Sequence, residues 1–444
     1  MDVFAALLFF FASLLFSIYQ KINILYPLLL GLLAFVCLAL RRDYDLAEIG
    51  RMLLQGSKKS LIVIRIFVLI GAITAVWRAC GTVAFIVYHG IALMSAQFFV
   101  LYAFLLSAGV SFLLGTSFGT VATIGVVLAV LAQSGSVDIN VAAGAILAGA
   151  YFGDRCSPMS SSAHLVAALT NTDLHRNIHN MLMTSLVPLA LTFIGYGLLS
   201  YWHPLHLQDN SVAEEITALF DIHPMTAVPA AIILIAAAFK IDVKASMLVS
   251  ILAGIGVGMV YQQQDFTTMV QFILLGFTLS GPGTFAAIIP GGGLVSMINV
   301  ALIVFLSSAY AGLFEGTQML REIDDFLTRL SRKIGSYPAT VLTSIATAAL
   351  SCNQTLTVIL THQFAARFYE KHSLPSYRLA LDLENTAIVI SALIPWNIAV
   401  AFPIATLAAE PSCIIFAFYL YLIPLVNGMM KNLQPCSPPP HDRS

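Results

Sequence analysis

Long apolar runs with few charged positions fill most of this chain. These runs extend over 16 to 30 residues without the amphipathic stripe that marks a helix on the surface of a soluble protein, and this pattern is typical of membrane-spanning helices. They predict ten crossings, at roughly residues 5–19, 23–40, 61–88, 141–170, 181–201, 224–239, 245–261, 290–315, 376–406 and 411–430.

Two further apolar stretches, 98–133 and 337–366, have a polar centre. Each arm of these stretches spans about 24 Å as a helix, which is less than the roughly 30 Å of a hydrocarbon core. They are therefore predicted to be re-entrant hairpins. Pro158 and Pro395 interrupt two of the crossings, and proline breaks the hydrogen bonding of a helix interior. These two crossings are predicted to be broken helices.

The composition agrees with a membrane protein. Of the 444 residues, 59% are hydrophobic and 10% are charged, whereas a soluble domain carries about 25% charged residues. The net charge of −1 indicates no nucleic-acid partner. The six cysteines are far apart without a CxxC pair and are predicted to be buried hydrophobic residues, not metal ligands or disulfides. No cofactor is implied.

The basic residues predict the sidedness. When the N-terminus is placed in the cytoplasm, most of the 21 Lys and Arg residues face that compartment, as the positive-inside rule requires. The predicted outer loop 202–223 carries acidic residues and no Lys or Arg. We therefore expect a protein of the inner cell membrane with both termini in the cytoplasm. The polar, proline-rich segment 431–444 is predicted to be a disordered tail.

The two halves of the chain resemble each other. Residues 20–56 align with 240–276, the hairpin centre 115–120 aligns with 352–357, and Pro158 aligns with Pro395. Basic loops in one half have counterparts without basic residues in the other half. We therefore expect an all-α fold with two inverted repeats, 1–201 and 224–430, joined by 202–223. Such repeats with broken helices are typical of secondary transporters, although chance similarity between apolar stretches is the alternative.

The first broken helix gathers polar residues at its centre. Freed backbone carbonyls, serine hydroxyls and a carboxylate suit a hard cation such as sodium, and a carboxylate at this depth also suits a titrating proton. The alternative is that Asp154 and Arg155 only neutralise each other. The candidate residues are Asp154, Arg155, Ser157, Pro158, Ser160 and Ser161.

The second broken helix and the hairpin tips supply the remaining candidates. Glu384 is the expected proton carrier, while Asp382 is closer to the cytoplasm as a cap or as a partner of Arg378. Small and hydroxylated residues at the tips let the backbone approach a ligand, or else serve only in helix packing. The candidates in these segments are Thr116, Ser117, Asn353, Gln354, Glu384, Asn385, Thr386, Pro395 and Asn397.

Four other polar residues are weaker candidates for a binding role. Arg78 and Glu315 occupy similar places in the two halves. His175 and His179 have the spacing of metal ligands on a helix, but no third ligand is near in the sequence.

Three segments carry a family resemblance: GAYFGDRCSPMSSSAHLVAALTNTDLHRNIHNM (149–181), GTSFGT (115–120) and LDLENTAIVISALIPWN (381–397). They resemble the NhaC-type sodium/proton antiporters of the ion transporter superfamily over nearly the whole chain. The resemblance implies paired hairpins and exchange of sodium for protons, with organic anions or amino acids as cargo in some relatives. It also implies two departures, because Ser161 and Asn385 stand where the family has acids.

Two transport hypotheses follow. In the first, Asp154 and Glu384 carry sodium and protons by alternating access across the lipid bilayer. In the second, Arg155 or Arg78 pairs with the carboxylate of an organic acid or amino acid. A membrane-embedded enzyme is less favoured, because no HExxH, GxSxG or paired catalytic aspartates occur in the membrane segments. A channel is the remaining alternative, and the sequence leaves a homodimer open.

Overall fold

A computed structural model describes residues 2–20, 22–93, 96–203, 211–239, 241–279, 281, 283–317, 319, 333–351 and 353–433. Across these residues the fold is helical, with one isolated backbone bridge between Phe277 and Gly291 and no strand. This confirms the predicted all-α class. The predicted tail lies almost entirely outside the described residues.

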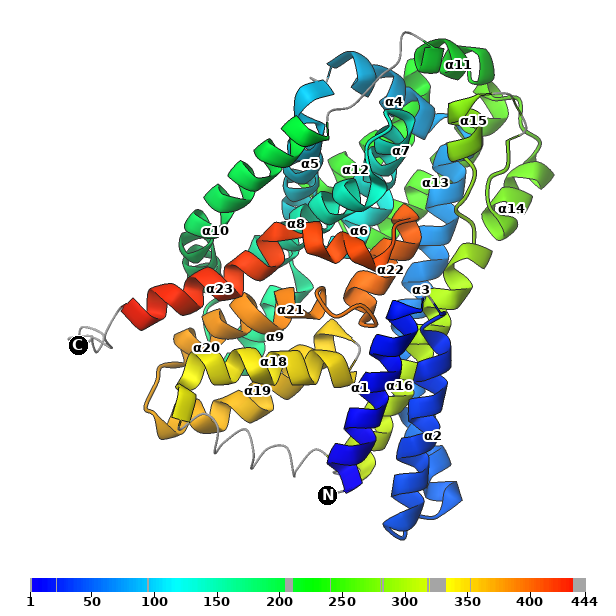
Figure 1. Ribbon diagram of the computed structural model, residues 1–444. Coiled ribbons are helices and arrows are strands. Elements are labelled where there is room, and N and C mark those ends of the chain that lie inside the picture. Colours follow the sequence, from blue (N-terminus) through cyan, green and yellow to red (C-terminus); the bar gives the residue numbers. More distant parts are fainter. Residues whose placement is uncertain are drawn as a thin grey trace.

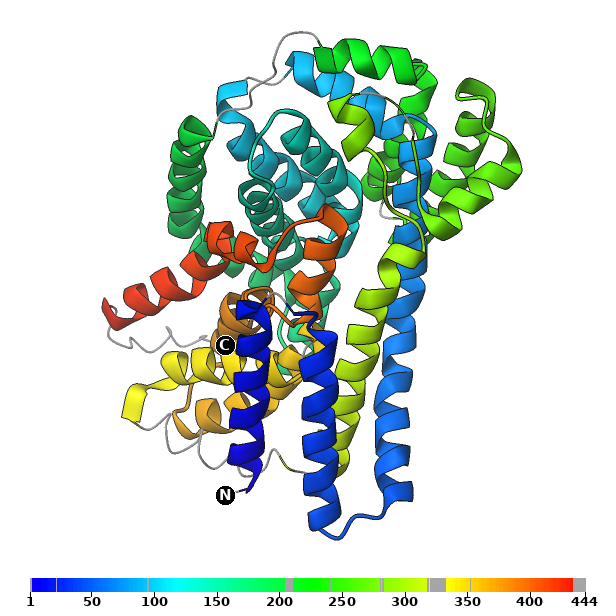
Figure 2. The ribbon, with the colours of Figure 1, turned by 45° about the vertical axis from the view of Figure 1, so that its right-hand side comes forward.

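Four helices form a long bundle along one side of the molecule (Figure 2). They are α1 (Asp2–Tyr19), α2 (Leu25–Arg41), α3 (Leu46–Ala79) and α16 (Ile298–Thr317). Helices α3 and α16 approach closely through Gly56 and Gly312, where an added Cβ would lie 2.2 Å from Ser308 O and 2.3 Å from Met52 O respectively. Glycine is therefore required at this crossing.

Helix α3 corrects the predicted boundaries in this region. The sequence predicts a crossing over 61–88, but the helix begins much earlier, because Asp45 caps one continuous 34-residue helix. That helix ends at Ala79, and α4 (Thr82–Leu93) continues after a bend of 65°. The left-handed conformation of Gly81, with φ of 80°, accounts for the bend, because glycine adopts it without steric cost.

The first hairpin and the first broken helix pack against each other (Figure 1). One arm of the hairpin is α5 (Phe99–Leu114), and the other comprises α6 (Ser117–Thr120), a π-helical segment (Val121–Gly125) and α7 (Val126–Ser134). The broken helix consists of α8 (Ile139–Cys156) and α9 (Ser161–Thr170). The break at 157–160 confirms the interruption predicted from Pro158.

The second hairpin and the second broken helix follow the same plan. The hairpin comprises α18 (Ser336–Ser351) and α19 (Gln354–Lys371). The broken helix comprises α20 (Ser376–Leu383), a π-helical segment (Glu384–Ile388), α21 (Val389–Ser391) and, after a break at 392–397, α22 (Ile398–Leu407). The predicted interruption around Pro395 is therefore confirmed.

The remaining elements surround these units. They are η1 (Ala96–Phe98), α10 (Leu174–Trp202), α11 (Ser211–Leu219), η3 (Pro224–Ala227), α12 (Val228–Ala238), α13 (Val243–Tyr261), α14 (Phe266–Leu275), α15 (Thr284–Ile288), η4 (Val295–Met297), η6 (Pro411–Phe416) and α23 (Phe418–Leu433). Segment 202–223, predicted as a loop, therefore contains a helix, α11.

By length and composition, four helices among the described residues can cross a membrane, or six if each of two bent pairs forms one span. The four are α10, α13, α16 and the arm Ser117–Ser134. The last was predicted as half of a re-entrant hairpin. The count of ten crossings and the inverted relation of the two halves stay predictions.

Candidate functional site

The break after α8 is held in place by its own serines. Ser157 Oγ donates a hydrogen bond to Phe112 O on α5 (2.6 Å) and accepts one from Met159 N (3.1 Å). Ser160 caps α9 by accepting from Ala163 N (3.2 Å). Both hydroxyls are thus engaged in supporting the broken backbone, whereas Ser161 is exposed.

Asp154 joins the break to both hairpin tips. Its carboxylate is 4% exposed, and Oδ2 accepts a hydrogen bond from Gln354 Nε2 (3.1 Å) and from Ser117 Oγ (3.5 Å). Ser117 belongs to the first tip and Gln354 to the second. The structure therefore brings together three candidates that are far apart in the sequence. One carboxylate with a neutral hydroxyl and amide is the type of oxygen-rich site that suits a hard cation.

The two tips are built alike. Thr116 and Asn353 are both extended, with φ of −150° and −145°, and both cap the helix that follows. The Thr116 hydroxyl accepts from Gly119 N (3.5 Å), and Asn353 Oδ1 accepts from Thr355 N (2.9 Å). These two candidates thus orient the tips, and the next residue of each tip contacts Asp154.

Arg155 points to partners other than its neighbour Asp154. Its buried guanidinium donates to Ser185 Oγ (2.5 Å), Thr184 Oγ1 (3.1 Å), Met181 O (3.3 Å), Tyr419 OH (2.9 Å), Cys156 Sγ (3.5 Å) and Asn385 Oδ1. The alternative that Asp154 and Arg155 form a mutual ion pair is wrong. Arg155 instead ties the first broken helix to α10, α23 and the second broken helix.

Glu384 is a buried carboxylate with no hydrogen-bond partner among the described residues. Both of its oxygens are enclosed and unpaired, as is Nδ2 of the adjacent Asn385. Arg155 and Asp154 are the charged groups that act on it. Since a buried carboxylate without hydrogen bonds is costly in its ionised form, the geometry suits a protonated Glu384 in this conformation.

Neighbouring residues on the second broken helix have structural partners. Thr386 accepts a hydrogen bond from Ser344 (2.9 Å) and donates to Asp382 O (2.6 Å). Asp382 accepts from Tyr369 OH (2.5 Å). Thr386 and Asp382 thus fasten this helix to the second hairpin.

The second break is also tied to the second hairpin. Asn397 caps α22 by accepting from Ala399 N (3.0 Å), and its Nδ2 donates to Ala348 O (2.8 Å). Tyr151 of α8 donates to Ala399 O (2.9 Å). The two broken helices therefore meet directly at Tyr151, three residues before Asp154.

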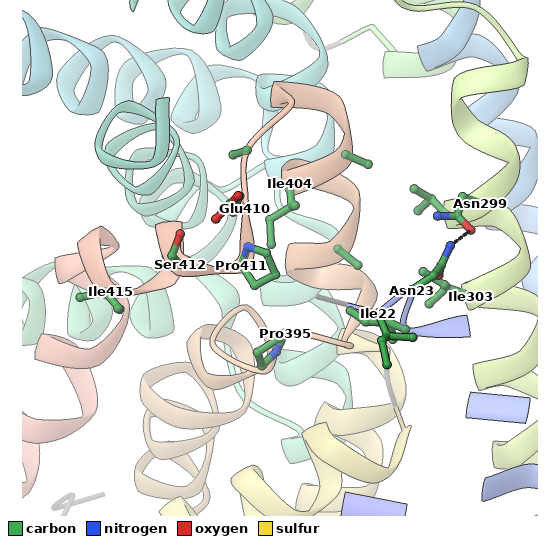
Figure 3. Close-up of a pocket in the computed structure, with 15 residues that line it drawn as sticks. Ile22, Asn23, Asn299, Ile303, Pro395, Ile404, Glu410, Pro411, Ser412 and Ile415 are labelled. Atoms are coloured by element: carbon green, nitrogen blue, oxygen red, sulfur yellow. Dashed lines mark hydrogen bonds between the residues drawn. The ribbon is translucent and has the colours of Figure 1, made fainter. Parts of the chain in front are cut away.

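A cavity of about 730 Å³ reaches the second break from the side of the long bundle. It lies between the loop before α2, α16 and the segment from α22 to η6, and Pro395 forms part of its wall (Figure 3). Its lining is mainly apolar, with Asn23 Nδ2 donating to Asn299 Oδ1 (3.3 Å) on one side. Neither Asp154 nor Glu384 lines it.

Four predicted or considered residues lie apart from Asp154. Arg78 is in the last turn of α3, and Glu315 is exposed on α16. His175, like His179, is exposed in the first turns of α10, and the described residues contain no group of three metal-binding side chains.

Sequence reasoning missed the partners of Arg155, namely Ser185, Thr184 and Tyr419. Each is a lone polar residue in an apolar helix, and such residues are common at helix contacts in membranes. The sequence therefore contained a weak signal, but nothing that connected them to Arg155.

A model of the Na⁺/H⁺ antiporter family matches residues 2–158 and 149–427, which together cover most of the chain. The chain belongs to the Na⁺/H⁺ antiporter family. This confirms the resemblance seen in the sequence, and it identifies the chain as an integral membrane transporter, in agreement with its apolar helices.

Three antiporters illustrate the range of the family. The chain is 28% identical over 394 residues to the Na⁺/H⁺ antiporter NhaC of Alkalihalophilus pseudofirmus, covering 86% of this chain and 84% of the relative. It is 25% identical to the malate-2H⁺/Na⁺-lactate antiporter of Bacillus subtilis, covering 86% and 83%. It is also 25% identical to the arginine/ornithine antiporter ArcD of Halobacterium salinarum, covering 78% and 74%.

Proposed function

We propose that this member of the Na⁺/H⁺ antiporter family exchanges sodium for protons, with Asp154 as the carboxylate ligand of the cation. The observation that carries the proposal is the buried Asp154 carboxylate held between the two hairpin tips. Its partners are neutral, so the carboxylate supplies the charge that a monovalent cation requires. Gln354 can present its amide oxygen in place of its nitrogen by rotating, which would convert this contact into a cation ligand.

Glu384 is the proposed proton carrier. It has no hydrogen-bond partner among the residues that the structure describes, and it lies in the electrostatic field of the permanently charged Arg155. The positive charge of that guanidinium favours the ionised form of Glu384. The same charge repels sodium, so it disfavours sodium binding beside Glu384. Arg155 thereby separates the two tasks, leaving sodium to Asp154 and the proton to Glu384.

The sidedness and repeat structure belong to the same proposal. Two hairpin and broken-helix units that meet at Asp154 suit alternating access between two inverted repeats. The distribution of basic residues supports an inner-membrane location with cytoplasmic termini.

The test is sodium-driven proton flux in proteoliposomes that contain the full chain. Asp154→Asn keeps the size of the side chain and removes its charge, and we expect it to abolish the flux. Asp382→Asn is the matched control, because it removes another buried carboxylate from the broken-helix region, and it should retain flux. Normal flux in Asp154→Asn would remove this residue from the mechanism.

Exchange of an organic acid or amino acid is the second candidate, since two relatives carry such cargo by name. Arg155 is a poor ligand for that cargo because both of its terminal nitrogens already donate hydrogen bonds to protein groups. Counterflow of labelled lactate and labelled arginine, measured beside labelled sodium, separates the two candidates.

A further inference from the structure

Arg78 is a buried cation without a counter-charge among the described residues. The residue is 8% exposed, in the last turn of α3. Among the described residues, no carboxylate lies within ion-pair distance of its guanidinium. A buried charge without a partner is costly, and a guanidinium cannot avoid the cost by losing its proton.

The hydrogen bonds of Arg78 leave one edge of the guanidinium without an acceptor among the described residues. Its Nη1 donates a long bond to Thr74 O (3.5 Å), a carbonyl of its own helix. Nε is buried and has no hydrogen-bond partner among the described residues. Nη2 makes no hydrogen bond to these residues either, and it is not fully enclosed. Nε and Nη2 form the parallel pair of donors that matches the two oxygens of a carboxylate.

A glycine loop forms the wall beside this guanidinium. An added Cβ at Gly291 would lie 3.6 Å from Cζ of Arg78 and 3.8 Å from both terminal nitrogens. The next residue, Gly292, approaches α3 so closely that a Cβ would lie 2.6 Å from Ala75 N. Both glycines have positive φ, 135° and 74°, so larger residues are disfavoured by conformation at both positions, and at Gly292 also by lack of space.

The loop is fixed in this position by backbone hydrogen bonds. Gly293 N donates to Gly71 O on α3 (2.8 Å), and Gly291 exchanges two bonds of 2.9 Å with Phe277. The loop lies between α15 and α16, and the preceding helix α14 packs on α3 (Figures 1 and 2). The wall beside the guanidinium is therefore a fixed part of the fold.

We propose that Arg78 and the 291–293 loop form a binding site for a small monocarboxylate, which docks on the Nε–Nη2 edge. This site goes beyond the sodium/proton exchange, and its residues share no hydrogen-bond partner with Asp154. A carboxylate suits it better than a spherical anion such as chloride, because only the carboxylate engages both donors in parallel.

The experiment measures thermal unfolding of the detergent-purified full chain in choline acetate and in choline chloride at equal ionic strength. At an acetate concentration ten times the Kd, a ligand that binds only the folded state lowers the unfolding equilibrium constant about 11-fold. We expect this shift in the native chain with acetate and not with chloride. An equal response to both salts would overturn the carboxylate assignment.

Variants assign the effect to the site. Arg78→Gln should remove the acetate shift, whereas Arg65→Gln, which removes an exposed cation from the same helix, should keep it. If Arg78→Gln does not fold, Arg78→Lys retains the charge without the parallel donors and should bind labelled acetate at least tenfold more weakly. An unchanged shift in Arg78→Gln, or native affinity in Arg78→Lys, would refute the proposal.

A further variant separates this site from the antiport mechanism. Asp154→Asn should lose sodium flux and still show the acetate shift. Loss of the acetate shift in that variant would contradict a separate site at Arg78, whereas normal flux with an intact shift would contradict only the role of Asp154.

Discussion

Gly153 sets how closely the first hairpin approaches the first broken helix. An added Cβ at this residue of α8 would lie 2.2 Å from Ser111 C and 2.3 Å from Phe112 N, both backbone atoms of α5. Ordinary contacts of a Cβ begin at 3.4 Å. In Gly153→Ala, α5 and α8 must therefore separate by about 1 Å, and overpacking of this kind costs about 1–3 kcal/mol.

The displacement would also reach Asp154. Phe112 O holds the break through Ser157, and the tip that follows α5 positions Ser117 at 3.5 Å from Asp154 Oδ2. Because this hydrogen bond is already long, a shift of about 1 Å would break it. We expect Gly153→Ala to lower both the free energy of unfolding and the rate of sodium-driven proton flux.

Thermal unfolding of the purified chain and flux in proteoliposomes are the assays. Gly109→Ala is the matched control, because it lies on α5 and an added Cβ meets no atom within 4 Å. Alanine is favoured over glycine in a helix by about 1 kcal/mol, so the control should be neutral or stabilising. Equal stability and flux in the two variants would refute this account of the packing.

Two further substitutions test the attachment of the second broken helix. Tyr369→Phe removes the hydrogen bond to Asp382 and should destabilise the fold by about 1–3 kcal/mol, measured by thermal unfolding; the exposed Tyr201→Phe should change nothing. Asn397→Ala removes the cap of α22 and the bond to Ala348 O and should cost about 1–2 kcal/mol in the same assay, with native stability arguing against the capping role.

The breaks were predictable from the sequence because proline has a local and strong effect. Pro158 and Pro395 both lie in non-helical segments, as expected. The length of α3 was not predictable in the same way, because charged residues at its first turns resemble those of a separate surface helix. Its continuity depends on packing against α16 through Gly56 and Gly312, which pairs segments distant in the sequence.

Part of the candidate site was accessible from sequence and part was not. Asp154 and Glu384 stood out as carboxylates within apolar segments, and the polar tips stood out by composition. The direction of Arg155 could not be derived, since adjacent residues on a helix point about 100° apart and the partners of Arg155 outside its own helix come from three other elements. The lack of a carboxylate beside Arg78 among the described residues likewise depends on tertiary packing, which the sequence does not reveal.

The most direct test of the account is equilibrium binding of labelled sodium to the purified full chain. The account predicts that Asp154→Asn loses saturable sodium binding and that Glu384→Gln, which removes the proposed proton carrier, retains it. Saturable sodium binding of native affinity in Asp154→Asn would contradict the central claim that the carboxylate between the hairpin tips holds the cation.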